Sequence, residues 1–380
     1  MLHIVADDKI PFLKGVLEPF AEVKYLPGSE ISREDVLHAD ALIVRTRTRC
    51  DSRLLKGTCV KFIATATIGH DHIDSDFCKS AGIAWTNAPG CNASSVMQYV
   101  ASALVTVAVQ KKVNLAGKTL GIIGVGHVGK LVQKLADILG MKVLLNDPPR
   151  ERMEGPEKFT ELNQLLEEAD FISLHVPLTF QGVDKTFHLI DEQAFKLIRP
   201  TAWMFNTSRG EVVETHALKS ALSRNKMAGA VLDVWENEPE IDAELLRNVF
   251  IGTPHIAGYS VDGKANGTSM AVQALSSFFH LPLTAWYPTD LPAPAESQIH
   301  GNGLEASGAD LIEKAILHTY NLLNDSDLLR SAPADFEKQR NNYPVRREFK
   351  AYTIQSNLLT AGEKDKFSKL GIGILLGNEA

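Results

Sequence analysis

An arginine, a glutamate and a histidine stand in three separate stretches of the second half of the chain, NTSRGEVV (206–213), LDVWENEP (232–239) and TPHIAGY (253–259). Histidine is the usual acid/base at neutral pH, so His255 is suited to exchange a proton with an alcohol. Glu238 beside it would orient the imidazole ring and favour its protonated form. Arg209 could bind a substrate carboxylate through two parallel hydrogen bonds and polarise a carbonyl. Taken singly each would be a loop or surface side chain, but together they predict acid–base chemistry on a small acid.

Each of these stretches follows a short apolar run with the composition of a buried strand: AWMF, AGAV and VFIG. Similar runs, TLGII, MKVLL and DFISL, precede them and alternate with segments of helical length. Strands that alternate with helices indicate βαβ units and a doubly wound parallel sheet. Ligands bind beyond the carboxyl ends of the strands in such sheets, so the three stretches are expected at one edge.

A glycine-rich turn follows the first of these strands and opens a helix. Gly124, Gly126 and Gly129 fit the spacing GxGxxG, and Asp147 stands 18 positions after the last of them. Gly124 would permit the tight turn, Gly126 the approach of a pyrophosphate to backbone N–H groups, and Gly129 close helix–strand packing. Because strand, helix and acidic residue coincide, the pattern predicts a dinucleotide site rather than an unrelated structural turn.

The acidic residue bears on which dinucleotide is bound. Asp147 would accept hydrogen bonds from the adenosine ribose and repel a 2′-phosphate, which favours NAD over NADP. Arg150 and Arg152 lie close by in the sequence, and an arginine is what a 2′-phosphate requires, so NADP stays an alternative. With NAD, hydride transfer would leave an alcohol proton for His255 to remove.

The composition limits the class of protein. The chain has 380 residues, 44% hydrophobic and 22% charged, with a formal net charge of −7, which is typical of a soluble protein of two or three domains. No general nucleic-acid surface is expected, since that needs clustered positive charge. The four cysteines show no paired spacing, so neither disulfides nor a zinc site is indicated, and free thiols suit a cytoplasmic protein. The most apolar run, 99–109, is too short for a membrane span and predicts a buried helix.

Residues 1–92 repeat the alternation of strands and helices, in LHIVA, VKYL, ALIVR, VKFIATA and IAWTN. CNASSVMQYVASALVTVAVQKK then predicts one long helix, with Asn92 as its N-cap. A proline-rich linker starts near residue 282, and helical and strand-like segments follow it. The expected fold is therefore α/β: two doubly wound parallel-sheet (Rossmann-like) domains plus a small C-terminal α+β domain.

The glycine motif, HVP at 175–177, NTSRG, LDVWENEP and TPHIAGY in succession resemble the D-isomer-specific 2-hydroxyacid dehydrogenases, over residues 1 to about 280. The resemblance implies that Arg209 binds the substrate carboxylate and carbonyl, that Glu238 supports His255, and that His255 is the proton acid/base. It also implies NAD as the cofactor and a set of cofactor-binding residues: Gly124, Gly126, His127, Val128, Gly129, Asp147, His175, Val176, Pro177, Thr207, Asp233 and Gly258. Asp233 would meet the nicotinamide carboxamide.

The family's substrate domain is discontinuous, which places its counterpart here in residues 1–92 and 258–281. The NAD-binding domain would then be 93–257. The sequence of the C-terminal part of the chain resembles a branch of the family that acts on a phosphorylated 2-hydroxyacid. Members of that branch form homodimers through an additional domain, which would be residues 286–380 here.

The stretch VRTRTRC (44–50) is a candidate for binding the substrate. If extended, it would place Arg45, Arg47 and Arg49 on one face. The resemblance assigns Arg45 and Thr46 to the substrate side, which makes Arg47 the next candidate for a phosphate and leaves Arg49 as a surface charge.

Further substrate contacts are expected from a loop and from one tyrosine. The backbone N–H groups of Thr67, Ile68 and Gly69 could bind the C1 carboxylate, and Tyr259 could hydrogen-bond the substrate, or it could be a core or interface aromatic. No metal is expected, because HDH at 70–72 lacks a third ligand at a recognisable spacing.

Two alternatives stay open on the sequence. Another member of the family, such as 3-phosphoglycerate dehydrogenase, also oxidises a phosphorylated 2-hydroxyacid. An NAD-sensing, corepressor-like binding module would be no enzyme at all, although the complete Arg209, Glu238 and His255 set favours catalysis. In the tail, Arg340, Arg346 and Arg347 could reach a phosphate, even in a partner subunit, or could form a solvated helix face.

Overall fold

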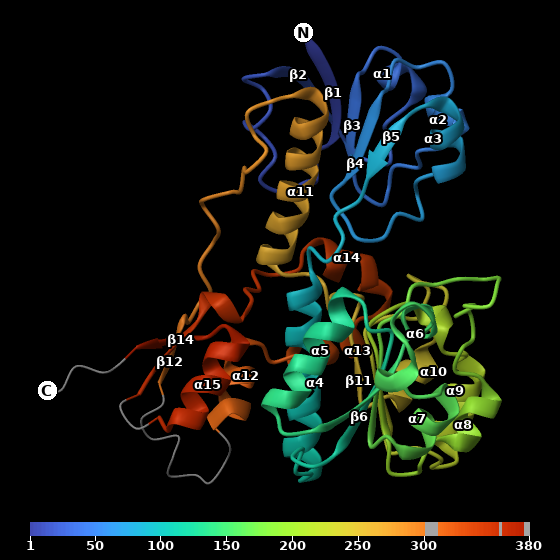
Figure 1. Cartoon of the computed structure of the whole chain (residues 1–380), viewed down its shortest axis with the longest axis vertical. Helices are drawn as coiled ribbons and strands as arrows, with labels where there is room; N and C mark the ends of the chain where they lie inside the picture. Colours follow the sequence, from blue (N-terminus) through green and yellow to red (C-terminus); the bar gives the residue numbers. More distant parts are fainter. Residues whose placement is uncertain (301–310, 357–358, 376–380) are drawn as a thin grey trace, which may run out of the picture. The chain divides into compact units, whose positions relative to one another are not determined.

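The computed structural model describes residues 1–300, 311–356 and 359–375 and divides the chain into two compact units (Figure 1). The first unit combines Met1–Asn92 with Ser260–Pro292, and the second combines Ala93–Tyr259 with Ala293–Ala380. Two chain segments that are far apart in the sequence thus complete each unit. The α/β class predicted from the alternation of apolar runs is confirmed.

The first unit is built on a five-stranded parallel sheet with the strand order β2-β1-β3-β4-β5. Its strands are β1 (Leu2–Asp7), β2 (Ala21–Leu26), β3 (Ala41–Val44), β4 (Phe62–Thr65) and β5 (Ala84–Thr86). Every residue of β3 and β4 is buried, because helices and loops cover both faces of a parallel sheet. The helices of this unit are α1 (Arg33–Val36), α2 (Ser52–Leu55), α3 (Ser75–Ala81) and α11 (Val261–Phe279).

The last of these helices returns from the distant end of the sequence to cover the sheet. Apolar residues of α11, including Ala271 and Leu275, pack in one core with Ile4 and Ile43 of the strands. Gly267 allows the close approach, since a Cβ there would lie 2.6 Å from the carbonyl oxygen of Ala66. The first unit therefore has a complete core only when residues beyond Tyr259 are included.

The second unit contains a six-stranded parallel sheet with the order β11-β10-β9-β8-β6-β7. The strands are β6 (Thr119–Ile123), β7 (Lys142–Asn146), β8 (Phe171–Leu174), β9 (Trp203–Asn206), β10 (Gly229–Leu232) and β11 (Ile251–Gly252). The helices that alternate with them are α4 (Ala93–Lys111), α5 (His127–Ile138), α6 (Pro148–Glu154), α7 (Leu162–Glu168), α8 (Glu192–Leu197), α9 (Thr215–Ser223) and α10 (Ala243–Asn248). The strand order reverses between β6 and β8, which is the place where doubly wound sheets bind ligands.

The helix α4 forms the centre of this unit. It is long and apolar enough to cross a membrane by length and composition, but 83% of its most apolar window is buried inside the structure. Residues 99–109 are part of this longer helix, and the prediction that they form a buried helix is confirmed. Burial is what identifies α4 as a core helix.

The C-terminal residues pack onto α4 and α5 rather than standing apart. They form a three-stranded parallel sheet of β12 (Gln298–His300), β13 (Thr353–Gln355) and β14 (Gly373–Leu375). Their helices are α12 (Leu311–Thr319), α13 (Leu323–Ser331), α14 (Phe336–Asn341) and α15 (Ala361–Leu370). The helical segments expected after the linker are present, and α12 and α13 are separated by only three residues. The role of residues 286–380 as a dimerisation domain stays a prediction.

The arginine-rich stretch is not a strand. β3 ends at Val44, and a turn follows in which the Thr48 N–H donates to the Arg45 carbonyl oxygen at 3.3 Å. Thr48 is buried, with its hydroxyl donating to the Gly28 carbonyl oxygen at 2.8 Å. The three arginines therefore do not share one strand face.

The glycine-rich turn between β6 and α5 supplies a test of packing. A Cβ on Gly129 would lie 2.1 Å from the Gly124 carbonyl oxygen, whereas a Cβ on Gly126 would meet nothing within 4 Å. Gly129→Ala is expected to destabilise the protein by about 2 kcal/mol or more through forced separation of helix and strand. Gly126→Ala should leave the melting temperature close to that of the wild type. Equal melting curves for the two variants would contradict this account of the turn.

Candidate active site

His255 and Glu238 are joined by a hydrogen bond at the carboxyl ends of neighbouring strands. Glu238 follows β10, His255 follows β11, and the distance from His255 Nδ1 to Glu238 Oε2 is 2.7 Å. The other oxygen, Oε1, accepts the Trp235 backbone N–H at 2.9 Å. The His255 side chain remains 31% exposed, so the far edge of its ring can be reached from outside. Because Nδ1 faces the carboxylate, Nε2 is the nitrogen left for proton transfer.

The charge state of Glu238 follows from these contacts. Burial alone would raise the pKa of this carboxyl, but the hydrogen bond and charge of His255 outweigh it. The Trp235 N–H and the charge of Arg340 add to this effect, and the pKa of Glu238 lies below its ordinary value. Glu238 is therefore ionised at neutral pH and stabilises a positive charge on the ring.

Asp233 holds the loop that carries His255. Its side chain is 1% exposed and accepts hydrogen bonds from the Thr253 hydroxyl at 2.6 Å and from the N–H groups of Ile256 at 2.7 Å and Ala257 at 2.8 Å. Burial raises the pKa of Asp233, although the charge of His255 and these donors oppose the shift. The sequence reasoning assigned Asp233 only to the nicotinamide carboxamide, so this positioning role was missed.

Arg209 lies in the turn after β9, and its Nη1 donates to the Ser208 carbonyl oxygen at 2.8 Å. Asn206 fixes this turn by accepting the Ser208 N–H and hydroxyl and by donating to the Arg209 carbonyl oxygen. A Cβ on Gly210 would lie 1.9 Å from the Trp235 carbonyl carbon. The glycine thus lets the Arg209 turn pack directly on the segment that leads to Glu238.

The turn at 124–129 fits the pyrophosphate of a dinucleotide. Gly126 is the N-cap of α5, and the space where its Cβ would stand is open. His127 and Val128 are the first residues of that helix, with His127 exposed. Backbone N–H groups at a helix N-terminus are free to bind an anion, and the helix dipole favours negative charge there.

Asp147 supports the same turn. Its Oδ2 accepts the Val125 N–H at 2.8 Å and its Oδ1 accepts the Arg150 N–H at 3.1 Å. The Arg150 guanidinium is held by Glu154 through two hydrogen bonds, and Arg152 pairs with Asp184 at 2.5 Å. Both arginines that could have served a 2′-phosphate are thus already paired with carboxylates, which favours NAD.

His175 joins the two segments expected to line the cofactor groove. Its ring nitrogens meet the Ser173 hydroxyl at 2.9 Å and the Thr207 hydroxyl at 3.3 Å. Burial lowers the pKa of His175 to about 3, so the ring is neutral. A Cβ on Gly124 would lie 2.5 Å from the His175 carbonyl oxygen and 2.9 Å from Val176, so the HVP segment, with Pro177, lies against the glycine turn. Gly258 is half-buried beyond the loop that Asp233 holds.

The candidate substrate residues of the first unit lie after β3 and β4. The Thr67 hydroxyl is 2.7 Å from the Thr65 hydroxyl and donates to the Gly69 carbonyl oxygen at 2.9 Å. The Asn87 amide donates to the Ile68 carbonyl oxygen at 2.8 Å. These hydrogen bonds hold the loop 67–69 through the Thr67 side chain and the carbonyl oxygens of Ile68 and Gly69. Arg45 donates to the Lys9 carbonyl oxygen at 3.2 Å, and Thr46 is exposed.

Arg47 and Arg49 line one pocket of about 350 Å³ together with Arg33, Arg53 and Asp51. Arg49 is exposed, as expected for a surface charge, although it lines the same pocket as Arg47. Asp51 lies 3.3 Å from Arg49 Nε and 3.2 Å from Arg53 Nη2, which partly neutralises two of the four guanidinium groups. The pocket carries an excess of positive charge.

Within the described residues no group of three or more His, Cys, Asp and Glu side chains is placed to hold a metal ion. His72 of the HDH stretch lies 3.1 Å from the Thr65 hydroxyl instead. Burial lowers the pKa of His72 to about 4, and the charge of His70 adds to this effect while that of Asp71 opposes it.

The tail arginines are not a solvated helix face. Arg346 is 5% exposed and donates from Nη2 to the Ser95 hydroxyl and, at 2.6 Å, to the Ala257 carbonyl oxygen. Arg340 donates to the Tyr259 hydroxyl at 3.2 Å, and the Arg347 carbonyl oxygen accepts the Gln98 amide at 3.0 Å. Long-range contacts of this kind leave no periodic signal in the sequence.

Comparison with known proteins identifies the family. Residues 97–257 match the NAD-binding domain of D-isomer-specific 2-hydroxyacid dehydrogenases, and residues 291–371 match a domain of unknown function, DUF3410. The erythronate-4-phosphate dehydrogenase of Bacteroides thetaiotaomicron is 50% identical over 93% of this chain and 99% of its own length. The enzyme of that name from Escherichia fergusonii is 39% identical over 93% of this chain and 94% of its own length.

Solved structures agree with this assignment. The D-lactate dehydrogenase of Aquifex aeolicus, in complex with NAD and lactic acid, is 30% identical with a TM-score of 0.59, over 74% of this chain and 96% of that one. The NAD-bound 3-phosphoglycerate dehydrogenase of Entamoeba histolytica is 26% identical with a TM-score of 0.62, over 77% of this chain and 99% of that one. The chain therefore belongs to the erythronate-4-phosphate dehydrogenase family of D-isomer-specific 2-hydroxyacid dehydrogenases, and it is an NAD-dependent dehydrogenase.

Proposed function

We propose that the protein oxidises 4-phosphoerythronate to 2-oxo-3-hydroxy-4-phosphobutanoate with NAD, as a step of pyridoxal phosphate (vitamin B6) biosynthesis. The observation that carries the chemistry is the His255–Glu238 pair at 2.7 Å, in the same unit as a glycine turn with an open pyrophosphate cradle. The substrate rests on the names of relatives that match nearly the whole chain.

His255 acts as the general base in the direction of oxidation. Its Nε2 takes the proton of the C2 hydroxyl while Nδ1–H stays bonded to Glu238, which stabilises the imidazolium that forms. The chemistry that NAD supplies when bound is acceptance of the hydride from C2. Loss of a proton from oxygen and of a hydride from carbon leaves the ketone of the product, so the step balances.

Arg209 is proposed to bind the C1 carboxylate and to polarise the C2 oxygen. The first unit is proposed to supply Thr67, Ile68 and Gly69 for the carboxylate, Arg45 and Thr46 for the substrate, and Arg47 for the phosphate. Tyr259 is proposed to hydrogen-bond the substrate.

The cofactor residues divide by the part of NAD that they would hold. Gly124, Gly126, His127, Val128 and Gly129 surround the pyrophosphate cradle, and Asp147 serves the adenosine ribose. The segments at 175–177 and at Thr207, together with Gly258, would line the groove, and Asp233 would serve the carboxamide. For Asp233 this would add to the three hydrogen bonds that its carboxylate already accepts.

We further propose a cytoplasmic homodimer that assembles through residues 286–380, which light scattering on the purified chain can test. Neither a nucleic acid nor a membrane is proposed as a partner, because the chain has a net charge of −7 and α4 is a core helix.

The proposed activity is tested by NAD reduction with 4-phosphoerythronate, 3-phosphoglycerate and D-lactate. We expect the highest kcat/KM with 4-phosphoerythronate. A preference for 3-phosphoglycerate would favour the competing dehydrogenase, and the absence of turnover with all three would favour an NAD-sensing module. As a control, His255→Ala should reduce turnover by about 10²–10⁴-fold, the usual contribution of a general base.

Glu238→Gln tests the ion pair through the pH profile. The neutral amide no longer stabilises the imidazolium, so the ring loses its proton at lower pH and the base form persists further into acid. The acidic limb of the kcat/KM profile for oxidation is expected to move downward by roughly 0.5–1 pH unit, the scale of one lost charge at hydrogen-bond distance. If the chemical step is rate-limiting and the acidic limb stays in place, the proposal that Glu238 raises the pKa of His255 is wrong.

Arg47→Ala tests the assignment of the phosphate. The KM for 4-phosphoerythronate is expected to rise about tenfold, the scale of one charge-assisted hydrogen bond, while the KM for an unphosphorylated 2-hydroxyacid stays constant. Arg49→Ala is the matched control from the same pocket, because Asp51 already pairs with Arg49. Equal effects of the two substitutions would argue against a specific role for Arg47.

A further inference from the structure

Arg340 brings a positive charge from the C-terminal residues to the catalytic loop. It lies on α14, inside the segment that matches a domain of unknown function. Its Nη2 is 3.2 Å from the Tyr259 hydroxyl oxygen, and its guanidinium carbon lies 5.5 Å from the centre of the Tyr259 ring. Tyr259 is therefore held both by a hydrogen bond and by a cation–π contact.

The positive charge of Arg340 also affects the pKa of Glu238, the acid that pairs with His255. The charge of Arg340 is among the causes that hold the pKa of Glu238 below its ordinary value against the opposing effect of burial. Arg340 Nε is buried and has no hydrogen-bond partner, so the side chain keeps a spare donor at this place. A guanidinium only donates, which makes the Tyr259 oxygen the acceptor and leaves the hydroxyl proton directed elsewhere.

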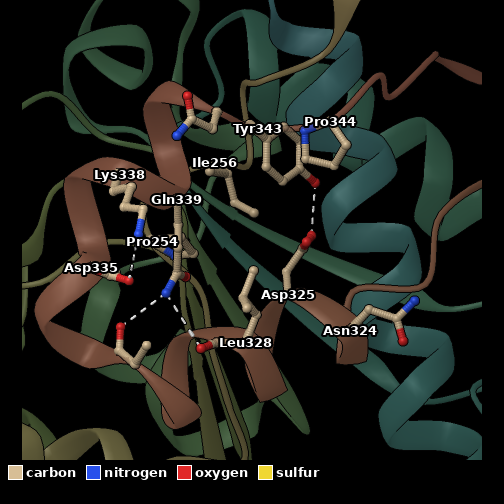
Figure 2. A pocket seen from close by; sticks show the side chains of 12 residues that line it. Pro254, Ile256, Asn324, Asp325, Leu328, Asp335, Lys338, Gln339, Tyr343 and Pro344 are labelled. Carbon is tan, nitrogen blue, oxygen red and sulfur yellow. Dashed lines mark hydrogen bonds and ion pairs between the residues drawn. The ribbon is translucent and has the colours of Figure 1, made fainter.

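The helix that carries Arg340 is fixed to the rest of its unit. Phe336 is 1% exposed, and the Gln339 amide donates to the Ala332 carbonyl oxygen at 3.0 Å. Figure 2 shows Gln339 and Tyr343 around the same pocket as Pro254 and Ile256, the two neighbours of His255. The C-terminal residues and the catalytic loop thus form one packed assembly.

A second arginine of the tail reaches the same loop from a different point. Arg346 Nη2 donates to the Ala257 carbonyl oxygen at 2.6 Å. The N–H group of the same residue, Ala257, donates to Asp233. The guanidinium carbon lies 4.4 Å from the centre of the Tyr320 ring, and the hydroxyls of Tyr320 and Tyr343 donate to Asp325 at 2.6 and 2.8 Å. The loop is therefore held by Asp233 on one side and by the tail on the other.

We propose that Arg340 is a positioning residue for the dehydrogenase reaction: from α14 it holds Tyr259, at the end of the loop that carries His255, and so places its positive charge beside that loop. The C-terminal segment thereby contributes to catalysis within its own protomer, apart from any part in assembly. The proposal rests on the proposed function for its substrate, and its charge effect is measurable without that substrate.

The test compares Arg340→Met, Arg340→Lys and Lys338→Met. Lys338 lies on the same helix, is largely exposed and pairs with Asp335 at 3.3 Å, so its substitution removes one positive charge without touching Tyr259. Arg340→Met is expected to reduce kcat/KM about tenfold, on the scale of one charged hydrogen bond. It should also move the acidic limb of the oxidation profile upward by roughly 0.5 pH unit, because loss of a positive charge favours the imidazolium.

Two further variants separate orientation from charge. Arg340→Lys keeps the charge, so the acidic limb should stay at the wild-type position while part of the KM defect remains. In a Tyr259→Phe background, Arg340→Met should add little to the KM but still move the limb. Lys338→Met should match the wild type in every readout.

Three results would overturn the proposal. These are unchanged kinetics and pH profile in Arg340→Met, the same limb shift in Arg340→Lys, or a loss of activity that follows only a loss of dimer mass in light scattering. If the wild type does not oxidise 4-phosphoerythronate, the proposed function fails by itself. The charge effect of Arg340 is then measured without substrate. Diethyl pyrocarbonate modifies the neutral His255 ring, and mass spectrometry of the peptide that contains His255 gives the extent of modification at each pH. If the midpoint of this pH curve is the same in Arg340→Met as in the wild type, the charge effect is overturned.

Discussion

The buried carboxylate of Asp233 is the interaction on which the geometry of the catalytic loop depends. An ionised acid that is 1% exposed is costly unless donors surround it, and here the donors are the backbone and hydroxyl groups of residues 253–257. Burial of the acid and order in the loop therefore require one another. His255 has a φ of 56°, a left-handed conformation that is unusual for a residue other than glycine. The loop can keep that conformation because Asp233 and the tail arginines hold it at several points.

Close backbone contact is the second constraint, and it lies at the strand ends where the candidate residues gather. The turns at Gly124 and Gly210 pack against the HVP and Trp235 segments at distances that no side chain would permit. Arg209, Glu238 and the glycine turn follow different strands, so these contacts add to the local hydrogen bonds in fixing their positions relative to one another. The candidate catalytic residues follow β9, β10 and β11 in chain order, and they gather at one edge because the strands are parallel and their carboxyl ends meet there.

Local patterns were enough to predict the strands of both sheets, the glycine turn and the residues that follow each strand. They could not show that Asp233 holds the loop, because two of the three hydrogen bonds that its carboxylate accepts come from backbone N–H groups, which carry no side-chain signature. Arg346 was expected either to reach a phosphate or to lie on a solvated helix face, since charged residues are rarely buried. Its burial is explained by contacts with the distant Ser95, Ala257 and Tyr320. VRTRTRC alternates like a strand, but Thr48 turns inward to Gly28 and the chain bends.

The pKa shifts of the two acids beside the His255 loop have opposite directions: the pKa of Asp233 is raised and that of Glu238 is lowered. Glu238 has a pKa below 4.5, so it contributes stability that is present above that value and is lost as the pH falls through the lower, folded-state pKa. Asp233 has a pKa above 3.8, so ionisation of this acid works against the fold, and protonation relieves that cost as the pH falls. The two acids differ in the contacts that oppose the effect of burial. Both feel the charge of His255, but Glu238 also accepts a hydrogen bond from the His255 ring and feels Arg340, whereas the hydrogen bonds to Asp233 come from neutral donors. The acid that pairs with His255 is thus the one whose charged form the C-terminal residues also favour, through Arg340.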